Sequence, residues 1–135
     1  TYSGHPVAAA VALKNIEILE SEGIIEQVKA ETSPYLQQRW QELADHPIVG
    51  EARGLGMVAS LELVKDKATK ERLAPNAAGG GVCRDYSMEN GLIMRSCGDI
   101  MVISPPLVIT KAEVDELIEK AKKTLDDTAR FYNLI

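Results

Sequence analysis

Residues 110–132 constrain the fold of this chain most, because their pattern is helical from end to end. Thr110 and Glu113 stand at the spacing of a capping box, in which each side chain binds the backbone N–H of the other residue. Apolar residues then follow at helical spacing, at Val114, Leu117, Ile118, Ala121, Leu125 and Tyr132. We predict one long amphipathic helix whose apolar stripe packs on another part of the protein.

Two further helices are predicted in the first third of the chain. Pro6 suits the first helical position because proline has no N–H to lose there, and Gly23 ends the helix that follows. Apolar residues lie on nearly all sides of residues 7–22, so we expect this helix to be buried on more than one side. The next helix runs over residues 24–43, with a kink or short break expected before Pro34.

The middle of the chain is rich in β-forming residues and interrupted by glycines. Residues 48–64 contain the best strand, 57–64, and their glycines indicate a bulge or a close backbone approach. Residues 65–81 are charged, contain proline and end in three glycines, which predicts a mobile surface loop.

A hairpin is predicted after a short helix over residues 82–90. Residues 92–95 and 100–103 have the composition of strands, and the pair Gly98-Asp99 between them supplies the positive φ of a tight turn. The two strands should therefore be antiparallel neighbours. The predicted fold class is α+β, a small antiparallel sheet with helices packed on it, in a single domain over residues 1–135.

Composition narrows the class of partner. The 135 residues carry a formal net charge of −5 without a run of Lys or Arg, so we expect neither nucleic acid nor a membrane surface as a partner. No apolar stretch is long enough to span a bilayer, and two cysteines without close spacing favour a reducing, cytoplasmic location. The first residue is Thr1 and not Met, and residues 1–4 have the composition of a loop, so we expect that an upstream segment has been removed.

The spacing of the histidines, cysteines and glycines does not indicate a metal site or a nucleotide site. His5, His46, Cys83 and Cys97 lack the spacing of metal ligands, so we predict no metal site. A Cys–His nucleophile pair stays open from sequence alone, but packing is the better-supported role for both cysteines. The glycines of residues 54–56 and 79–81 match neither a dinucleotide fingerprint nor a phosphate loop, and we interpret them as tight packing and loop flexibility.

Arg95 is the one candidate binding residue. It lies in an apolar strand, on the same face as Ile93, where an unpaired charge would be costly. One interpretation is that Arg95 reaches solvent or pairs with a carboxylate such as Asp99. The other is a substrate anchor, because a guanidinium can hold a carboxylate through two charge-assisted hydrogen bonds, each worth roughly 1.5 to 3 kcal/mol.

Three blocks in fixed order carry a resemblance to a known family: TYSGHPVA at residues 1–8, VGEARGLGM at 49–57 and MRSCGDIMVISPPL at 94–107. The chain resembles class III aminotransferases that depend on pyridoxal 5'-phosphate (PLP), especially the ω-amine:pyruvate transaminase group. The likeness covers essentially the whole chain. It implies the C-terminal segment of a fold-type I PLP enzyme, with a loop and interdomain helix over residues 1–23 and the small C-terminal domain over residues 24–135.

The resemblance also implies roles for two residues. Thr1 matches the family threonine whose hydroxyl and backbone hold the PLP phosphate of the opposite subunit, which implies a homodimer. Arg95 matches the arginine that pairs with the α-carboxylate of alanine or pyruvate and swings aside for amines without a carboxylate. The implied reaction moves an amino group from a primary amine or ω-amino acid to pyruvate and gives alanine.

Two further features of the sequence bear on the acceptor and on the catalytic residues. Acetylornithine-type and ornithine-type relatives have an arginine shortly before Pro105-Pro106, where this chain has Val102-Ile103-Ser104, so the likeness favours pyruvate over 2-oxoglutarate as acceptor. The Schiff-base lysine, the aspartate at the pyridine nitrogen and the ring-stacking aromatic belong to the family's upstream large domain and have no matching motif here.

We therefore expect these residues alone to be inactive and assign them no catalytic residue. The physiological donor stays open among putrescine, another diamine and an ω-amino acid. Two alternatives remain, a non-catalytic small binding or interaction domain and a different small α+β enzyme, which would need a nucleophile and a base.

Overall fold

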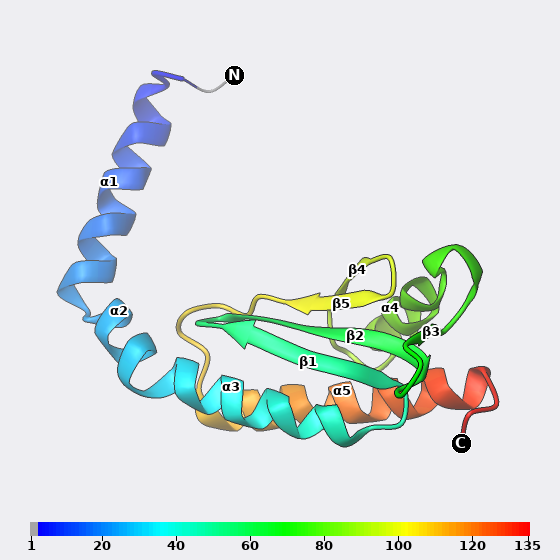
Figure 1. Ribbon diagram of the computed structural model, residues 1–135. Helices are drawn as coiled ribbons and strands as arrows, with labels where there is room; N and C mark the ends of the chain where they lie inside the picture. Colours follow the sequence, from blue (N-terminus) through cyan, green and yellow to red (C-terminus); the bar gives the residue numbers. More distant parts are fainter. Residues whose placement is uncertain (1–2) are drawn as a thin grey trace.

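Helix α5 (Lys111–Phe131) lies beside α3 (Ser33–Gln41) along one face of a small β-sheet (Figure 1). The computed structural model describes residues 3–135. The predicted capping box begins α5, since Glu113 N–H donates to Thr110 Oγ1 over 3.2 Å and Thr110 N–H donates to Glu113 Oε2 over 2.8 Å. The apolar stripe of this helix is buried, which confirms the prediction for this segment.

The predicted break before Pro34 is a change of helix type. The elements here are α1 (Pro6–Ser21), α2 (Ile24–Gln27), a π-helical turn (Val28–Thr32), α3 and a 3₁₀ turn (Glu42–Asp45). The N–H of Ser33 donates to the carbonyl of Val28, five residues earlier, which is the wide spacing of a π turn. Because Pro34 has no N–H, the wide turn lets the chain stay helical across a residue that cannot continue the α-helical ladder.

The sheet is antiparallel throughout. Its strands are β1 (Val49–Leu55), β2 (Val58–Asp66), β3 (Glu71–Arg72), β4 (Arg95–Cys97) and β5 (Ile100–Ile103). The order is β1-β2-β5-β4, with β3 paired to β2. The predicted segment 48–64 is thus a hairpin of two strands, and the expected bulge appears as a register shift between Val49 and Glu51. The structure confirms the α+β class.

A single core lies between the sheet and the helices. Its largest fully buried side chains include Trp40 and Leu36 from α3, Leu61 and Leu63 from β2, and Leu125 from α5. The indole Nε1 of Trp40 donates to the backbone oxygen of Ser60 over 3.1 Å. Because a buried N–H without an acceptor is costly, this bond lets the largest core side chain sit against the sheet.

Two local predictions are wrong. Helix α4 (Gly79–Glu89) begins at the three glycines assigned to a mobile loop, and two of them, Gly79 and Gly80, are buried. The preceding segment also contains β3 and a 3₁₀ turn (Pro75–Ala77). Residues 92–94 are not a strand, since β4 begins only at Arg95.

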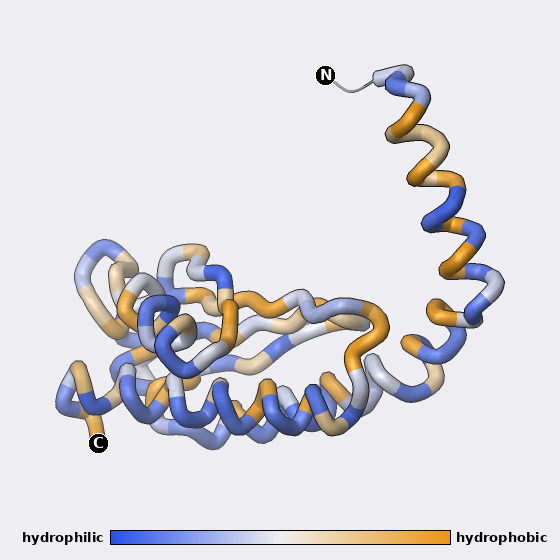
Figure 2. Tube along the Cα trace, turned by 180° about the vertical axis from the view of Figure 1, so that it is seen from behind, coloured by the Kyte–Doolittle hydropathy of each residue, from blue (hydrophilic) through white to orange (hydrophobic). Residues whose placement is uncertain are grey.

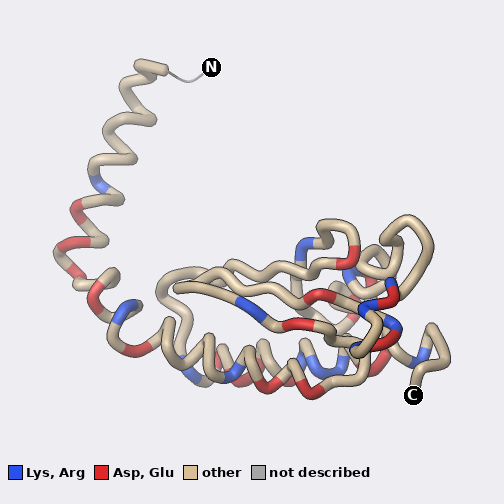
Figure 3. Tube along the Cα trace, viewed as in Figure 1, with Lys and Arg blue, Asp and Glu red and all other residues tan. Residues whose placement is uncertain are grey.

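Helix α1 extends away from the rest of the structure (Figure 1). None of its residues is buried, and Val7, Val11 and Leu13 are 64%, 64% and 70% exposed. Figure 2 shows apolar residues along its length, and Figure 3 shows that its first half, residues 6–13, carries no charge. The burial expected for this helix is therefore not met within residues 3–135. No helix in the described part of the chain is long and apolar enough to cross a membrane.

Candidate functional site

One face of the sheet is open within residues 3–135. Side chains alternate between the two faces of a strand, and burial follows that alternation. On β2, the residues facing the helices are buried (Ala59, Leu61, Leu63), while those between them are exposed or half-buried (Val58, Ser60, Glu62). Helices α3 and α5 cover the first set, so the second set belongs to a surface that we call the open face.

Arg95 lies at one edge of the open face. The strand register places four residues in one row across the sheet, in the order Arg53, Ser60, Val102 and Arg95. The row therefore carries a guanidinium at each end. Arg53 is paired, since its Nη1 lies 2.8 Å from Glu51 Oε2.

The side chain of Arg95 has no such partner in the described part of the chain. Arg95 is exposed, and no hydrogen bond or ion pair within residues 3–135 involves its guanidinium. Ile93, two residues before it, is 83% exposed. The exposure of Arg95 agrees with the interpretation that its side chain reaches solvent. The alternative pairing with Asp99 is wrong, because Asp99 is buried and its Oδ1 accepts a 3.1 Å hydrogen bond from Gly80 N–H. This arrangement leaves the guanidinium of Arg95 able to bind an anion from outside these residues.

The β4–β5 turn that carries Arg95 is fixed on two sides. Gly98 has φ +64°, as the sequence predicts for a tight turn. The backbone oxygen of Asp99 accepts from Leu63 N–H over 2.8 Å, and Ser96 Oγ donates to the Gly98 oxygen over 2.9 Å. Sequence reasoning missed the contact of Asp99 with Gly80. The two residues are 19 positions apart, and only the fold brings them together.

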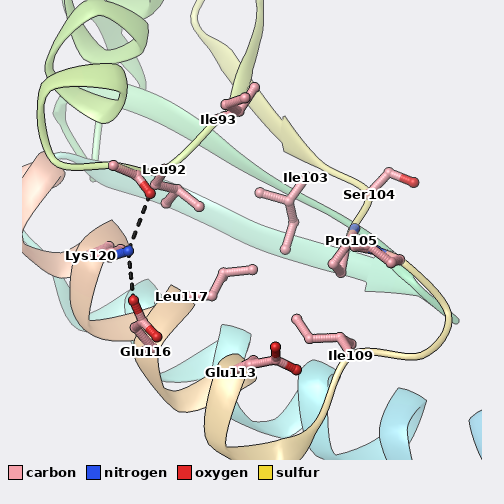
Figure 4. Close-up of a pocket in the computed structure, with 12 residues that line it drawn as sticks. Leu92, Ile93, Ile103, Ser104, Pro105, Ile109, Glu113, Glu116, Leu117 and Lys120 are labelled. Atoms are coloured by element: carbon pink, nitrogen blue, oxygen red, sulfur yellow. Dashed lines mark hydrogen bonds and ion pairs between the residues drawn. The ribbon is translucent and has the colours of Figure 1, made fainter.

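A groove of about 410 Å³ lies on the helix side of the sheet (Figure 4). Figure 4 shows Ile103, Ile109 and Leu117 pointing toward one another across it. Lys120 lies at one end of the groove, where its Nζ is 2.6 Å from Glu116 Oε1 and 3.3 Å from the backbone oxygen of Gly91. The carboxylate of Glu113, which also lines the groove, accepts hydrogen bonds from the N–H and hydroxyl of Thr110 over 2.8 Å each.

The two cysteines have different environments. Cys83 is buried in α4, and burial raises the pKa of its thiol to about 11. The prediction of packing is confirmed for Cys83 and wrong for Cys97, which is exposed. Among residues 3–135, no group of three or more His, Cys, Asp or Glu side chains could hold a metal ion.

The described residues do not form a complete site for PLP. The cofactor needs a lysine held in a pocket with an acidic partner for its ring nitrogen. Lysine side chains here form ion pairs at the surface. Lys14 Nζ lies 2.6 Å from Glu17 Oε1, and Lys65 Nζ lies 2.7 Å from Glu71 Oε1. The phosphate contact predicted for Thr1 lies outside the described residues.

Comparison with known proteins agrees with the fold. The family model described as aminotransferase class-III matches residues 1–125. A putrescine–pyruvate aminotransferase of Pseudomonas aeruginosa is 67% identical over 129 residues, which cover 96% of this chain and 28% of the relative. A diaminobutyrate–2-oxoglutarate transaminase of Halomonas elongata is 40% identical over 129 residues, covering 93% of this chain and 27% of the relative.

Solved structures give the same picture. A transaminase with L-alanine has a TM-score of 0.91 at 41% identity, covering 97% of this chain and 30% of that one. The ω-transaminase of Pseudomonas jessenii in complex with PMP has a TM-score of 0.89 at 36% identity, with coverage of 96% and 28%. The chain thus spans less than a third of the relatives that it matches. It belongs to the class III aminotransferase family.

Proposed function

We propose that this chain is the C-terminal segment of a PLP-dependent transaminase that moves an amino group from a primary amine or ω-amino acid to pyruvate, giving alanine. The observation that carries the proposal is the exposed guanidinium of Arg95 on the open face, which has no partner among residues 3–135, in a family member 67% identical to a putrescine–pyruvate aminotransferase. The absence of an arginine at residues 102–104 supports pyruvate as the acceptor. When bound, PLP supplies the electron sink for the reaction.

In this proposal Arg95 binds the carboxylate of pyruvate or alanine. A guanidinium presents two parallel N–H donors to a carboxylate, and a β-strand holds the base of the side chain in place. Amine donors such as putrescine have no carboxylate. Arg95 therefore contributes to the affinity for the acceptor and little to that for the donor.

The rest of the cofactor site is proposed to come from elsewhere. We assign Thr1 to the PLP phosphate of the opposite subunit in a homodimer, and the cofactor lysine to a large domain upstream of this segment. We place the complete enzyme in the cytoplasm. These roles follow the family pattern at residues 1–8.

Helix α1 supports an upstream domain. Its exposed side chains, among them Val7 and Leu13, form an apolar surface of a kind that soluble proteins normally cover. We propose residues 1–23 as a loop and interdomain helix, and residues 24–135 as the small domain. This apolar surface also counts against the alternative of a free-standing, non-catalytic binding domain.

The test is substitution of Arg95 in the full-length protein that carries this segment. Arg95→Ala should raise the KM for pyruvate by at least roughly ten- to a hundredfold, because each charge-assisted hydrogen bond that is lost is worth about 1.5 to 3 kcal/mol. The KM for a simple amine should change little. Arg53→Ala, at the other end of the same row, is the matched control and should leave the KM for pyruvate unchanged. Equal effects of Arg95→Ala on both substrates would remove Arg95 from this role.

The donor is identified by the same assay. Alanine formation from pyruvate is measured with putrescine, a longer diamine and an ω-amino acid, each at a range of concentrations. The donor with the highest kcat/KM defines the substrate class. No alanine from any of the three would contradict the proposed reaction.

A further inference from the structure

We infer that Asp99 is a positioning residue for Arg95, acting by clamping the β4–β5 turn to the N-terminus of α4. The inference rests on the proposed function, since it gives Asp99 a part in binding the carboxylate of the acceptor.

The first observation is the place of the Asp99 carboxylate. Asp99 is only 8% exposed, and its Oδ1 accepts a 3.1 Å hydrogen bond from the N–H of Gly80, the second residue of α4. The first N–H groups of a helix have no partner inside the helix and favour an anion. Asp99 thus caps α4 from a different part of the chain.

The second observation is the closeness of the two backbones. A Cβ atom on Gly80 would lie 1.9 Å from the Gly98 oxygen and 2.8 Å from Ser96 Oγ. The turn therefore rests directly on the first turn of α4. The hydrogen bond from Leu63 N–H to the Asp99 oxygen holds the turn to β2 on its other side.

The third observation is the small size of the strand that carries Arg95. Strand β4 has three residues and pairs only with β5, at the end of the strand order. Helix α4, by contrast, is fixed to α5, because Nδ2 of Asn90, the residue that follows α4, donates to Asp127 Oδ2 over 3.0 Å. The clamp connects this fixed helix to the short hairpin that presents Arg95. Loss of the clamp lets the hairpin shift, and with it the base of the guanidinium.

Two substitutions of Asp99 distinguish the effect of its side-chain length from the effect of its charge. Only Oδ1 has a hydrogen-bond partner within the described residues, and Oδ2 is buried without one. Asparagine keeps an oxygen at the Oδ1 position and keeps the length. Glutamate keeps the charge but moves the carboxylate outward by one methylene group. A positioning role therefore predicts that Asp99→Asn behaves like the native residue and that Asp99→Glu does not.

The experiment measures steady-state kinetics of the full-length enzyme. Asp99→Ala and Asp99→Glu should raise the KM for pyruvate about tenfold, since displacements near 1 Å at a binding group have effects of this order or larger. The KM for the amine should change less than about twofold by the same argument. Asp99→Asn should remain close to the native enzyme. Asp115→Ala, which removes a carboxylate between α3 and α5, is the control for general destabilisation and should leave both KM values unchanged.

A double-mutant cycle tests whether Asp99 acts through Arg95. Once Arg95 is alanine, Asp99→Glu should add no further rise in the KM for pyruvate, because residues that act as a unit are not additive. Hydrogen exchange gives a readout besides activity: residues 79–84 and 95–103 should exchange faster in Asp99→Glu than in the native protein or Asp115→Ala.

The outcomes separate the two proposals. If Arg95→Ala leaves the KM for pyruvate unchanged, the proposed function fails and the inference with it. If Arg95→Ala raises it while Asp99→Glu does not, only the inference fails. Multiplying effects in the double variant, or a native-like exchange pattern in Asp99→Glu, would likewise overturn the clamp. Should Asp99→Ala not fold, Asp99→Glu and Asp99→Asn still decide the question.

Discussion

The hydroxyl of Tyr35 donates a 2.7 Å hydrogen bond to Oδ1 of Asp115, and so joins α3 to α5 across 80 positions of sequence. Arg39 Nε donates to the same oxygen over 2.9 Å. The bond from Tyr35 is the main cause that holds the pKa of Asp115 below its usual value, and the same bond raises the pKa of Tyr35. The contacts between the two helices therefore favour the ionised form of Asp115.

A dependence of stability on acid follows from this arrangement. A carboxyl group whose pKa is lower in the folded chain stabilises the fold above its unfolded pKa of about 3.9, and this contribution is lost as pH falls through the folded pKa. Asp115→Asn removes the titrating group. The variant should be less stable at pH 7 and should lose less of its melting temperature between pH 7 and pH 3 than the native chain. Identical losses in thermal melts across this range would contradict the assignment.

The core predicts a large contrast between two leucines on the sheet. Leu61 is fully buried between the sheet and the helices, whereas Leu55 is 87% exposed at the end of β1. Leu61→Ala should lower the free energy of unfolding by about 2–5 kcal/mol, because it leaves a cavity in a packed interior. Leu55→Ala should change it by less than about 0.5 kcal/mol. Urea denaturation of the two variants measures both values, and similar midpoints would mean that the core is not where the structure places it.

Neighbouring glycines in α4 provide a second contrast. An alanine methyl at Gly80 would overlap the Gly98 oxygen, while at Gly81 nothing lies within 4 Å of the added Cβ. Gly81→Ala should stabilise the chain by up to about 1 kcal/mol, the difference in helix propensity between the two residues. Gly80→Ala should destabilise it, because the backbone of the β4–β5 turn has to move. Thermal unfolding of both variants checks the prediction, and a stabilising Gly80→Ala would exclude the close contact.

The sequence predicts the elements of this fold where a local pattern specifies them. The capping box of Thr110 and Glu113, the turn at Gly98 and the interruption of the helix before Pro34 all depend on residues a few positions apart, although the sequence did not predict that the interruption is a π-helical turn. Local chemistry decides these features, so they can be predicted without knowledge of the rest of the fold.

The errors arise where distant residues decide the conformation. Three glycines indicate a flexible loop in any local analysis, yet Gly80 is buried in a helix because the turn at Gly98 needs its small size. Asp99 was a plausible partner for Arg95 by proximity in sequence. In the fold, the N-terminus of α4 takes that carboxylate, and the guanidinium is left on the open face. The sequence therefore identifies Arg95 as the candidate binding residue, but it does not reveal the contact between Asp99 and Gly80 that supports the turn beside Arg95.

The two thiols should differ sharply in reactivity. Cys97 is exposed, and Cys83 is buried with the pKa of its thiol raised to about 11, so little reactive thiolate is present at neutral pH. A thiol reagent such as dithionitrobenzoate should label one cysteine of the native chain quickly and the other only as fast as the fold opens. Cys97→Ser should abolish the fast phase, whereas Cys83→Ser should leave it intact. In denaturant both cysteines should react at the same rate. Two equal fast phases in the native chain would show that α4 is not packed as the structure has it, and would also remove the support on which the Asp99 clamp depends.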